Sequence, residues 1–392
     1  MPLGLFPYSR LEVLRRQHRF AKASKLFSKH RYFIFFFVVY TLLLTRCTWI
    51  PALNGAVDGA LKLSGLRYSP ITLSVNFSTV QFDYRLLTEP MVERCVDKSL
   101  FVFIPSRPSA FEQREAIRQT WAHPNKTTKA AVFFVLGDAQ NDSLSEAVEE
   151  ENRISGDLIV TDVVDSYRNL SLKIYTSLDW YNMFCPNVPF ALKIDDDSVA
   201  ELDRLLHFVE TEFDKGDNKT IYGVIWRGTA VNRDANSTWY VPKELYERRR
   251  YPAYCNGPAY MMTSTAAKAI IEMAAETPLL QVEDALFTGI LASKALVRRV
   301  DKSGIFWWKD VVRAVQCDDQ GVPRLATMYP YPSPKELFAA YSRLLRVKCK
   351  QSADWVRRSC QEIEAPWRED GLSDSQLAQA VAEKKKEDKT ED

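Results

Sequence analysis

The segment Phe190-Ala-Leu-Lys-Ile-Asp-Asp-Asp197 decides the fold. Residues 188–194 form a short apolar run that includes β-branched side chains, a pattern that predicts a buried strand. This strand ends in three carboxylates, Asp195, Asp196 and Asp197. Because side chains alternate along a strand, we expect Asp195 and Asp197 to point to the same side.

Three adjacent anions at the end of a buried strand repel one another and lose hydration unless a cation lies beside them. Oxygen ligands suit Mn²⁺ or Mg²⁺, which keep positions open for phosphate oxygens. A solvated acidic loop is the alternative. Ser198 and Glu201 match a capping box that would start an amphipathic helix. The order strand, acids, helix puts the acids at the carboxyl edge of an α/β sheet, where ligands bind.

Similar apolar runs predict further strands at 99–104, 131–136, 158–164 and 220–226. Helical patterns lie between them, the first from about Ser109 to Trp121 with a capping box formed by Ser109 and Glu112. This alternation predicts βαβ units and a mostly parallel sheet flanked by helices. The aromatic stretch 239–260 favours a place in the core, with a platform for sugar rings as the alternative.

The amino-terminal region predicts a membrane anchor. Ten basic side chains, His18 and His30 included, lie within residues 10–31, and residues 32–45 carry no charge. Extended to residue 50, the apolar segment is long enough to span a thin bilayer, with a buried core helix as the alternative. Since the positive side stays cytosolic, residues 1–31 form a cytosolic tail and 32–50 a type II signal anchor.

Sequons and cysteines agree with a lumenal body. The N-glycosylation sequons are at Asn76, Asn125, Asn141, Asn169, Asn218 and Asn236, and the cysteines beyond the anchor are Cys95, Cys185, Cys255, Cys317, Cys349 and Cys360. Their wide spacing predicts disulfides rather than a zinc site, and fifteen pairings are open if all six pair. Residues 51–94 are expected to form a loosely structured stem, 95–360 the lumenal domain and 361–392 a charged, disordered tail. The net charge of +2 gives no global field that would favour nucleic acid.

Five motifs within residues 98–349 resemble the β-1,3-galactosyltransferase family (glycosyltransferase family 31). They are Arg114-Glu-Ala-Ile-Arg-Gln-Thr-Trp121, Asp165-Ser-Tyr-Arg-Asn-Leu-Ser-Leu-Lys173, Lys193 with Asp195, Asp196 and Asp197, Tyr251-Pro-Ala-Tyr-Cys-Asn-Gly257 with Tyr260, and Glu283-Asp284 with Gly289. The last has Ala285 where the family has Val. The resemblance implies a GT-A fold and a UDP-sugar donor.

The resemblance also implies roles for the acids. The Asp-Asp-Asp motif would bind the Mn²⁺–diphosphate of UDP, with Asp197 and Asp195 as metal ligands, and Asp195 and Asp196 beside the nucleotide. Asp284 would act as the general base that takes the proton of the acceptor hydroxyl in an inverting displacement, with Glu283 as the alternative.

Basic residues of the motifs are candidates for donor binding. Arg114 and Arg118 lie four residues apart and would share a helix face, where they would either hold the nucleotide or form structural ion pairs. Lys173 and Arg233 are further candidates for donor contacts. In the motif that contains Arg233, Thr238 replaces the Lys of the family.

One departure concerns a His that completes the metal shell in many relatives, because residues 327–329 contain Thr-Met-Tyr at the corresponding place. Water or another residue would then complete the shell, or metal binding would be weaker. The resemblance implies a Golgi type II membrane enzyme that transfers galactose, or N-acetylglucosamine, to a glycan on a glycoprotein or glycolipid. The alternative is an inactive relative that acts as a lumenal binding or chaperone-like subunit.

Overall fold

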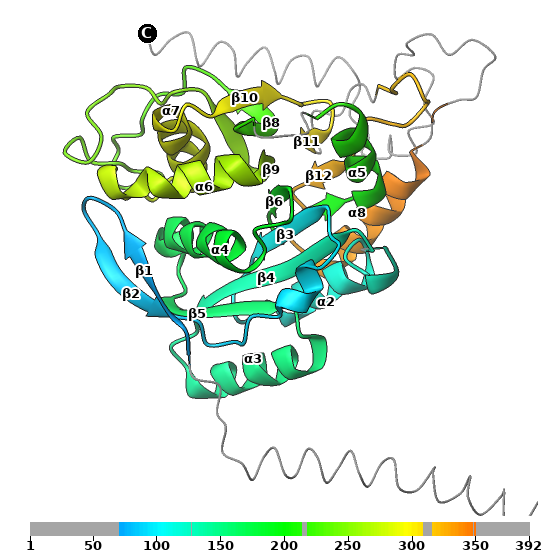
Figure 1. The fold of residues 1–392 in the computed structure, drawn as a ribbon, viewed down its shortest axis with the longest axis horizontal. Helices are drawn as coiled ribbons and strands as arrows, with labels where there is room; N and C mark the ends of the chain where they lie inside the picture. The colour runs from blue at the N-terminus through cyan, green and yellow to red at the C-terminus, as the bar shows by residue number, and fades with distance from the viewer. Residues whose placement is uncertain (1–69, 127, 214–217, 309–315, 348, 350–392) are drawn as a thin grey trace, which may run out of the picture. The chain divides into compact units, whose positions relative to one another are not determined.

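A computed structural model describes residues 70–126, 128–213, 218–308, 316–347 and 349 (Figure 1). The predicted cytosolic tail, signal anchor and carboxyl-terminal tail, together with residues 51–69 of the predicted stem, lie outside the described residues. Among the residues that the structure describes, no helix has the length and apolar character needed to cross a bilayer. The folded unit that contains the sheet begins at Pro70.

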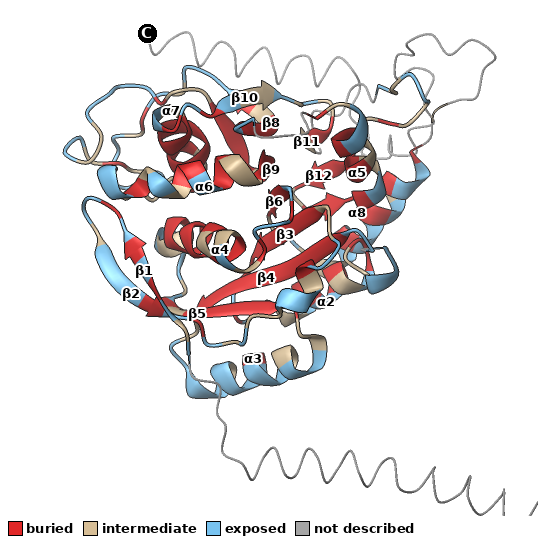
Figure 2. Cartoon of the chain, viewed as in Figure 1, coloured by how far each residue is buried: buried red, intermediate tan, exposed pale blue. Residues whose placement is uncertain are grey.

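A mixed, mostly parallel sheet of seven strands forms the centre of this unit, as the sequence predicts. In sheet order the strands are β10 (Arg298–Asp301), β8 (Thr220–Trp226), β9 (Tyr254–Thr263), β6 (Phe190–Ile194), β3 (Leu100–Pro105), β4 (Ala130–Asp138) and β5 (Leu158–Val164). β9 alone among them runs antiparallel to both of its neighbours. Every residue of β3 and β6 is buried, because helices cover both faces of the sheet (Figure 2).

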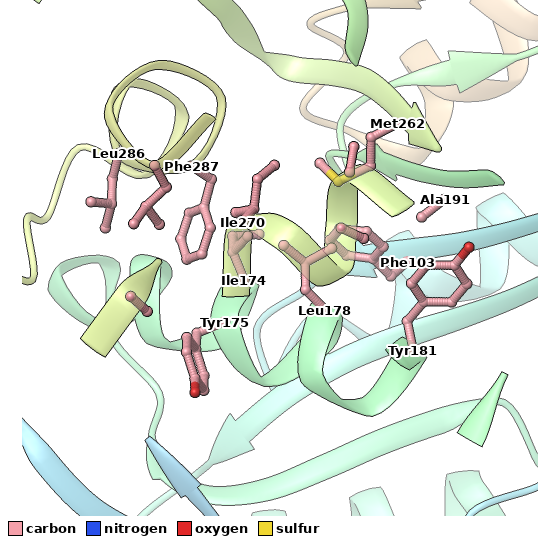
Figure 3. Close-up of a cluster of buried hydrophobic side chains, with 14 of the residues drawn as sticks. Phe103, Ile174, Tyr175, Leu178, Tyr181, Ala191, Met262, Ile270, Leu286 and Phe287 are labelled. Atoms are coloured by element: carbon pink, nitrogen blue, oxygen red, sulfur yellow. The ribbon is translucent and has the colours of Figure 1, made fainter. Parts of the chain in front are cut away.

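Two apolar cores lie on the two faces of the sheet. One joins the sheet to α4 (Leu170–Phe184), α6 (Ser264–Glu272) and the π-helix η5 (Ala285–Leu291), and Figure 3 shows Ile174, Leu178 and Ile270 meeting there. The helices on the other face are α2 (Phe111–Gln119), α3 (Asp142–Ser155), α5 (Leu202–Thr211) and α8 (Pro334–Arg346). Phe101 and Phe103 enter the first core, whereas Val102 and Ile104 enter the second, as the alternation of side chains along a strand requires.

Both capping boxes expected from the sequence are absent. The N-cap of α2 is Ala110, which has no side chain to accept a hydrogen bond. Between Ser198 and α5 the chain forms a short strand, β7 (Val199–Ala200), and the Glu201 carboxylate itself caps α5. β7 pairs with β12 (Thr327–Tyr329), which also pairs with β11 (Phe306–Trp308). Pairing with a strand more than a hundred residues away therefore overrides the local helix-start signal.

The described part of the predicted stem is folded into the domain. β1 (Thr72–Asn76) and β2 (Gln81–Arg85) form a hairpin, and η1 (Val92–Cys95) follows. Tyr84 is fully buried and its hydroxyl donates to Asp179 Oδ2 on α4 at 2.9 Å. The expectation of a loose stem up to residue 94 is therefore wrong from residue 70 onward, since a short alternating hairpin has no long period that the sequence would reveal.

Two disulfides join parts of the chain that are distant in sequence, as the cysteine pattern predicts. Cys95 pairs with Cys185, and Cys317 pairs with Cys349. Cys255 is a buried free thiol in β9. Cys47 and Cys360 lie outside the described residues.

A truncation series tests the hairpin's place in the core. A chain that begins at Pro70 should fold, whereas one that begins at Leu87 should lose about 5 kcal/mol or more of unfolding free energy. The cause is the loss of the buried side chains of Phe77, Tyr84 and Leu86, while the Cys95–Cys185 disulfide is kept. Urea denaturation of both chains measures the difference. Equal urea midpoints for the two chains would show that residues 70–86 do not stabilise the domain and belong to the stem.

Candidate active site

Strand β6 carries the acidic segment to the carboxyl edge of the sheet. β6 runs parallel to β3, so both strands end at this edge. The backbone N–H of Asp195 donates to the carbonyl of Pro258 at 2.9 Å, which continues the pairing with β9 for one more residue. Asp195, Asp196 and Asp197 are all partly exposed there. The pairing with antiparallel β9 thus holds the three aspartates at the edge of the sheet, outside the core.

Lys193 joins the acidic segment to the second acid pair. Its side chain is 1% exposed, and Nζ lies 2.6 Å from Asp195 Oδ1 and 3.0 Å from Glu283 Oε1. The third donor of the ammonium group goes to the carbonyl of Gly257 at 2.7 Å. Burial alone would lower the pKa of Lys193, but the charges of Asp195 and Glu283 outweigh it and raise the pKa. Lys193 is therefore a charged bridge between Asp195 and Glu283, which lie 88 residues apart in the sequence.

The three aspartates of the acidic segment have different partners. Asp195 pairs with Lys193, and Asp196 Oδ2 accepts from the Ser106 hydroxyl at 2.8 Å. Among the described residues the Asp197 carboxylate forms no ion pair, and its Oδ1 accepts from the Ser198 hydroxyl at 3.4 Å. Burial and then the charges of Asp195 and Asp196 raise the pKa of Asp197 to about 6. A cation beside Asp197 would therefore stabilise its charged form.

Glu283 and Asp284 precede the π-helix η5. Both Glu283 oxygens are engaged, one by Lys193 and the other by the Tyr260 hydroxyl at 3.2 Å, and the residue is 6% exposed. Asp284 is partly exposed, and its Oδ1 accepts the backbone N–H of Ala285 at 2.7 Å. Burial raises the pKa of both carboxyls, that of Asp284 to about 6. Of the pair, Asp284 is the more exposed, and among the described residues it forms no ion pair.

Gly257 explains how the two acids approach β9 so closely. A Cβ atom at this position would lie 3.3 Å from Asp284 Oδ2 and 3.4 Å from Glu283 Oε1. A side chain here would therefore crowd both carboxylates. The glycine of the Tyr-Pro-Ala-Tyr-Cys-Asn-Gly motif keeps this space open, which the sequence alone did not explain.

Lys173 and Arg114 lie behind the acidic segment. Lys173 Nζ donates to the Ser106 carbonyl at 2.8 Å and pairs with Asp165 at 2.6 Å. Arg114 is fully buried and contacts the Ser106 hydroxyl at 3.3 Å. Ser106, which follows β3, therefore connects both cations to Asp196. Sequence reasoning missed Ser106, although its position after a predicted parallel strand was a usable signal.

Arg114 and Arg118 of α2 form structural ion pairs, which is the second of the two roles that the sequence left open for them. Those of Arg114 go to Glu151 and to the carbonyls of Arg107 and Pro108. Arg118 forms ion pairs with Glu151 at 2.7 Å and Asp157 at 2.8 Å. These pairs connect α2 to α3 and to the residue before β5.

Arg233 lies away from the acids, in the long connection between β8 and β9. Its guanidinium group donates to the carbonyls of Val241, Tyr246 and Arg248 and so holds that loop together. The loop also carries the sequon at Asn236. Five sequon asparagines, at 76, 125, 141, 218 and 236, are exposed, whereas Asn169 is half-buried and donates through Nδ2 to the carbonyl of Val164 at 2.9 Å.

Tyr329 occupies the place at which the family pattern has a His. It ends β12, and its hydroxyl accepts from Asn256 Nδ2 at 3.1 Å. Two residues later, the backbone N–H of Tyr331 donates to the Asp197 carbonyl at 2.6 Å. The stretch is therefore next to the acidic segment, as the alignment of motifs implies, but it brings a phenol instead of an imidazole.

The donor set suits a hard cation that is shared with a ligand. Among the residues that the structure describes, no three His, Cys, Asp or Glu side chains are grouped to hold one ion. Mn²⁺ and Mg²⁺ are commonly bound by one or two carboxylates together with water and substrate phosphates. Asp197, an anion without a cationic partner among the described residues, fits that mode of binding.

Known proteins match this region of the chain. A family model described as Galactosyltransferase matches residues 112–303. Beta-1,3-galactosyltransferase 1 of Mus musculus is 32% identical over 212 residues, which are 54% of this chain and 64% of that protein. Beta-1,3-galactosyltransferase 2 of Homo sapiens is 31% identical over 223 residues, which are 55% of this chain and 52% of that protein. The chain thus matches less than two thirds of the length of these relatives.

Among solved structures, the galactosyltransferase LgtC in complex with donor and acceptor sugar analogues overlaps 65% of this chain and 98% of that one, with a TM-score of 0.33 and 11% identity. An overlap this low adds nothing to the argument. The residues that the family model matches, in contrast, include Lys193 and all five carboxylates of the site. These matches place residues 112–303 of the chain in the galactosyltransferase family.

Proposed function

We propose that this protein transfers a hexose from a UDP-sugar to a hydroxyl of a glycan acceptor, in β-1,3 linkage and with inversion. Galactose is the first choice of donor sugar and N-acetylglucosamine the second, in line with the names of the relatives. The observation that carries the proposal is the Lys193 bridge. It joins the acidic segment, which would bind the donor, to the acid pair, which would supply the general base.

The acidic segment would bind the diphosphate of the donor through Mn²⁺. Asp197 and Asp195 would hold the ion, with Asp196, oriented by Ser106, next to the nucleotide. When bound, the ion supplies positive charge to the departing UDP. Lys173 and Arg114 would act indirectly, because both contact Ser106, whose hydroxyl donates to Asp196. The engaged donors of Arg114, Arg118 and Arg233 support structural roles for these arginines.

Asp284 would be the general base. The acceptor oxygen forms a bond to the anomeric carbon while the bond from that carbon to UDP breaks, and the acceptor proton passes to Asp284. Its partial exposure and the lack of an ion pair among the described residues support this role. Glu283 is less suited, since Lys193 and Tyr260 already occupy both of its oxygens. Glu283 would instead hold Lys193, and Lys193 would hold Asp195.

The architecture agrees with a GT-A domain, and the two disulfides agree with the secretory pathway. We propose that the protein is a type II Golgi membrane protein with its catalytic domain in the lumen and its glycan acceptor on a glycoprotein or glycolipid. The exposed sequon asparagines are then candidates for N-glycosylation.

Amide substitutions of the two acids, one at a time, distinguish the general base from its neighbour. Asp284→Asn should lower kcat about 10²- to 10⁴-fold, the range for loss of a general base, with little change in donor KM or melting temperature. Glu283→Gln should instead lower the melting temperature, since it leaves the buried Lys193 with Asp195 as its one ion-pair partner among the described residues. UDP release and thermal unfolding measure both. Unimpaired turnover in Asp284→Asn together with an inactive, fully stable Glu283→Gln protein would exchange the two roles.

Metal dependence tests Asp197. UDP release should stop when Mn²⁺ is removed with EDTA and return when it is added back. Asp197→Asn should need at least tenfold more Mn²⁺ for half-maximal rate. Loss of even a residue that only orients a metal ligand commonly lowers metal affinity by that much. Asp203→Asn, an exposed acid on α5, is the matched control and should behave as wild type. An unchanged Mn²⁺ requirement in Asp197→Asn would remove Asp197 from the metal site.

The pH profile tests the state of Asp284. Its pKa is raised from the ordinary 3.8 to about 6, so at saturating Mn²⁺ the rate should fall as pH drops through about 6. A raised carboxyl pKa favours the protonated folded state, so protonation of Asp284 does not itself unfold the protein. Circular dichroism at pH 5 should therefore still show folded protein. A rate that stays constant down to pH 5 would contradict Asp284 as the base.

A further inference from the structure

Thr288 is a buried polar residue that the mechanism above does not use. It lies in η5, four residues after Asp284, and it is fully buried. The residues before it in the helix, Leu286 and Phe287, are also fully buried and belong to the apolar core shown in Figure 3. A hydroxyl in such surroundings is costly unless its hydrogen bonds are made, so its partners show what it does there.

The Thr288 hydroxyl joins Asp284 to strand β9. Its Oγ1 donates to the backbone carbonyl of Asp284 at 2.6 Å and accepts the backbone N–H of Cys255 at 2.8 Å. The Cys255 carbonyl lies 3.4 Å from Oγ1, but a hydroxyl has one proton, and the Asp284 carbonyl is much the closer acceptor. The hydroxyl therefore acts as donor and acceptor at once, and it fixes the backbone of the acid to the sheet.

Two glycines let η5 and β9 come close enough for this contact. A Cβ atom on Gly289 would lie 3.0 Å from the Tyr254 Cβ, and one on Gly257 would lie 3.3 Å from Asp284 Oδ2. Although burial raises the pKa of Asp284, the backbone N–H of Gly257 is among the groups that stabilise its charged form. Strand β9 thus holds Asp284 twice, through its carboxylate at Gly257 and through its carbonyl by way of Thr288.

We infer that Thr288 is a positioning residue for Asp284, because its hydroxyl sets where the acid lies relative to β9. The same strand receives Lys193 Nζ at the Gly257 carbonyl, 2.7 Å away, so β9 is a common reference for the donor-binding segment and the acid pair. The inference rests on the proposed function, in which Asp284 is the general base. A base must lie within hydrogen-bond reach of the proton it takes, and a misplacement of about 1 Å can lower a rate about 10²-fold.

Thr288→Val tests this role, since valine has nearly the same shape and lacks the hydroxyl. With methyl β-galactoside as acceptor, kcat should fall about tenfold to a hundredfold, whereas the KM values for UDP-galactose and for the acceptor should change by less than about twofold. Thr288→Ser keeps a hydroxyl and should recover kcat to within about threefold of wild type. An unchanged kcat in Thr288→Val, or an equal loss in Thr288→Ser, would overturn the inference.

Two controls separate positioning from a general loss of stability. Thr120, at the end of α2, is also buried, and its hydroxyl donates to the carbonyl of Ala116, four residues earlier, at 2.6 Å. Thr120→Val should lower the melting temperature as Thr288→Val does but keep the wild-type kcat. In the Asp284→Asn background, Thr288→Val should cause no further loss, because a residue that acts through Asp284 then has no base to position. Losses that multiply would make the role of Thr288 purely structural.

Hydrogen exchange tests the contact without catalysis. If wild-type protein releases no UDP, the proposed function fails, and amide exchange of residues 254–258 and 283–289 is then measured by mass spectrometry. Thr288→Val should exchange faster than wild type in both segments, because the Cys255 N–H has lost its acceptor, whereas Thr120→Val should not. If Thr288→Val does not fold, Thr288→Ala removes the same hydroxyl and replaces it in both assays. Equal exchange in wild type and in the variant without the hydroxyl would overturn the inference.

Discussion

The site depends on one buried ammonium group. Lys193 brings a positive charge into a position that is 1% exposed, where Asp195, Glu283 and the Gly257 carbonyl compensate it. Breaking a buried ion pair leaves an uncompensated charge and is strongly destabilising. The three partners belong to the end of β6, to β9 and to the start of η5, so the requirement to neutralise Lys193 also fixes these segments to one another. The fold and the site therefore depend on the same buried contacts.

This bridge also divides the carboxylates into two kinds. Asp195 and Glu283 are tied to Lys193, and Asp196 to Ser106, so their orientation is set before any ligand arrives. Asp197 and Asp284 form no ion pair among the described residues, and burial raises the pKa of each to about 6. Preorganised groups position a site, whereas groups left uncompensated gain most from binding a cation or a proton. The division matches a donor-binding role for Asp197 and a base role for Asp284.

Sequence reasoning was reliable where a signal is local and failed where it is not. The apolar runs predicted five of the seven strands of the main sheet, and the Asp-Asp-Asp and Glu-Asp motifs predicted the acids that the structure brings together. β9 was missed because its sequence, Tyr254-Cys-Asn-Gly-Pro, contains residues that usually interrupt strands. The hairpin at 72–85 and the β7–β12 pair were missed because each depends on a partner that no local pattern names. The same holds for Arg114, whose role follows from Glu151, 37 residues away.

Tyr329 illustrates how such a long-range partner changes the chemistry of a site without changing its frame. β12 pairs with β7 directly after the acidic segment, and Tyr331 continues to hold the backbone of Asp197. Burial raises the pKa of Tyr329 to about 12, so at neutral pH it stays a neutral phenol that accepts from Asn256. A neutral phenol is a poorer metal ligand than an imidazole. In the proposed mechanism the ion would therefore rely on carboxylates and donor phosphates, which links metal affinity to the presence of the UDP-sugar.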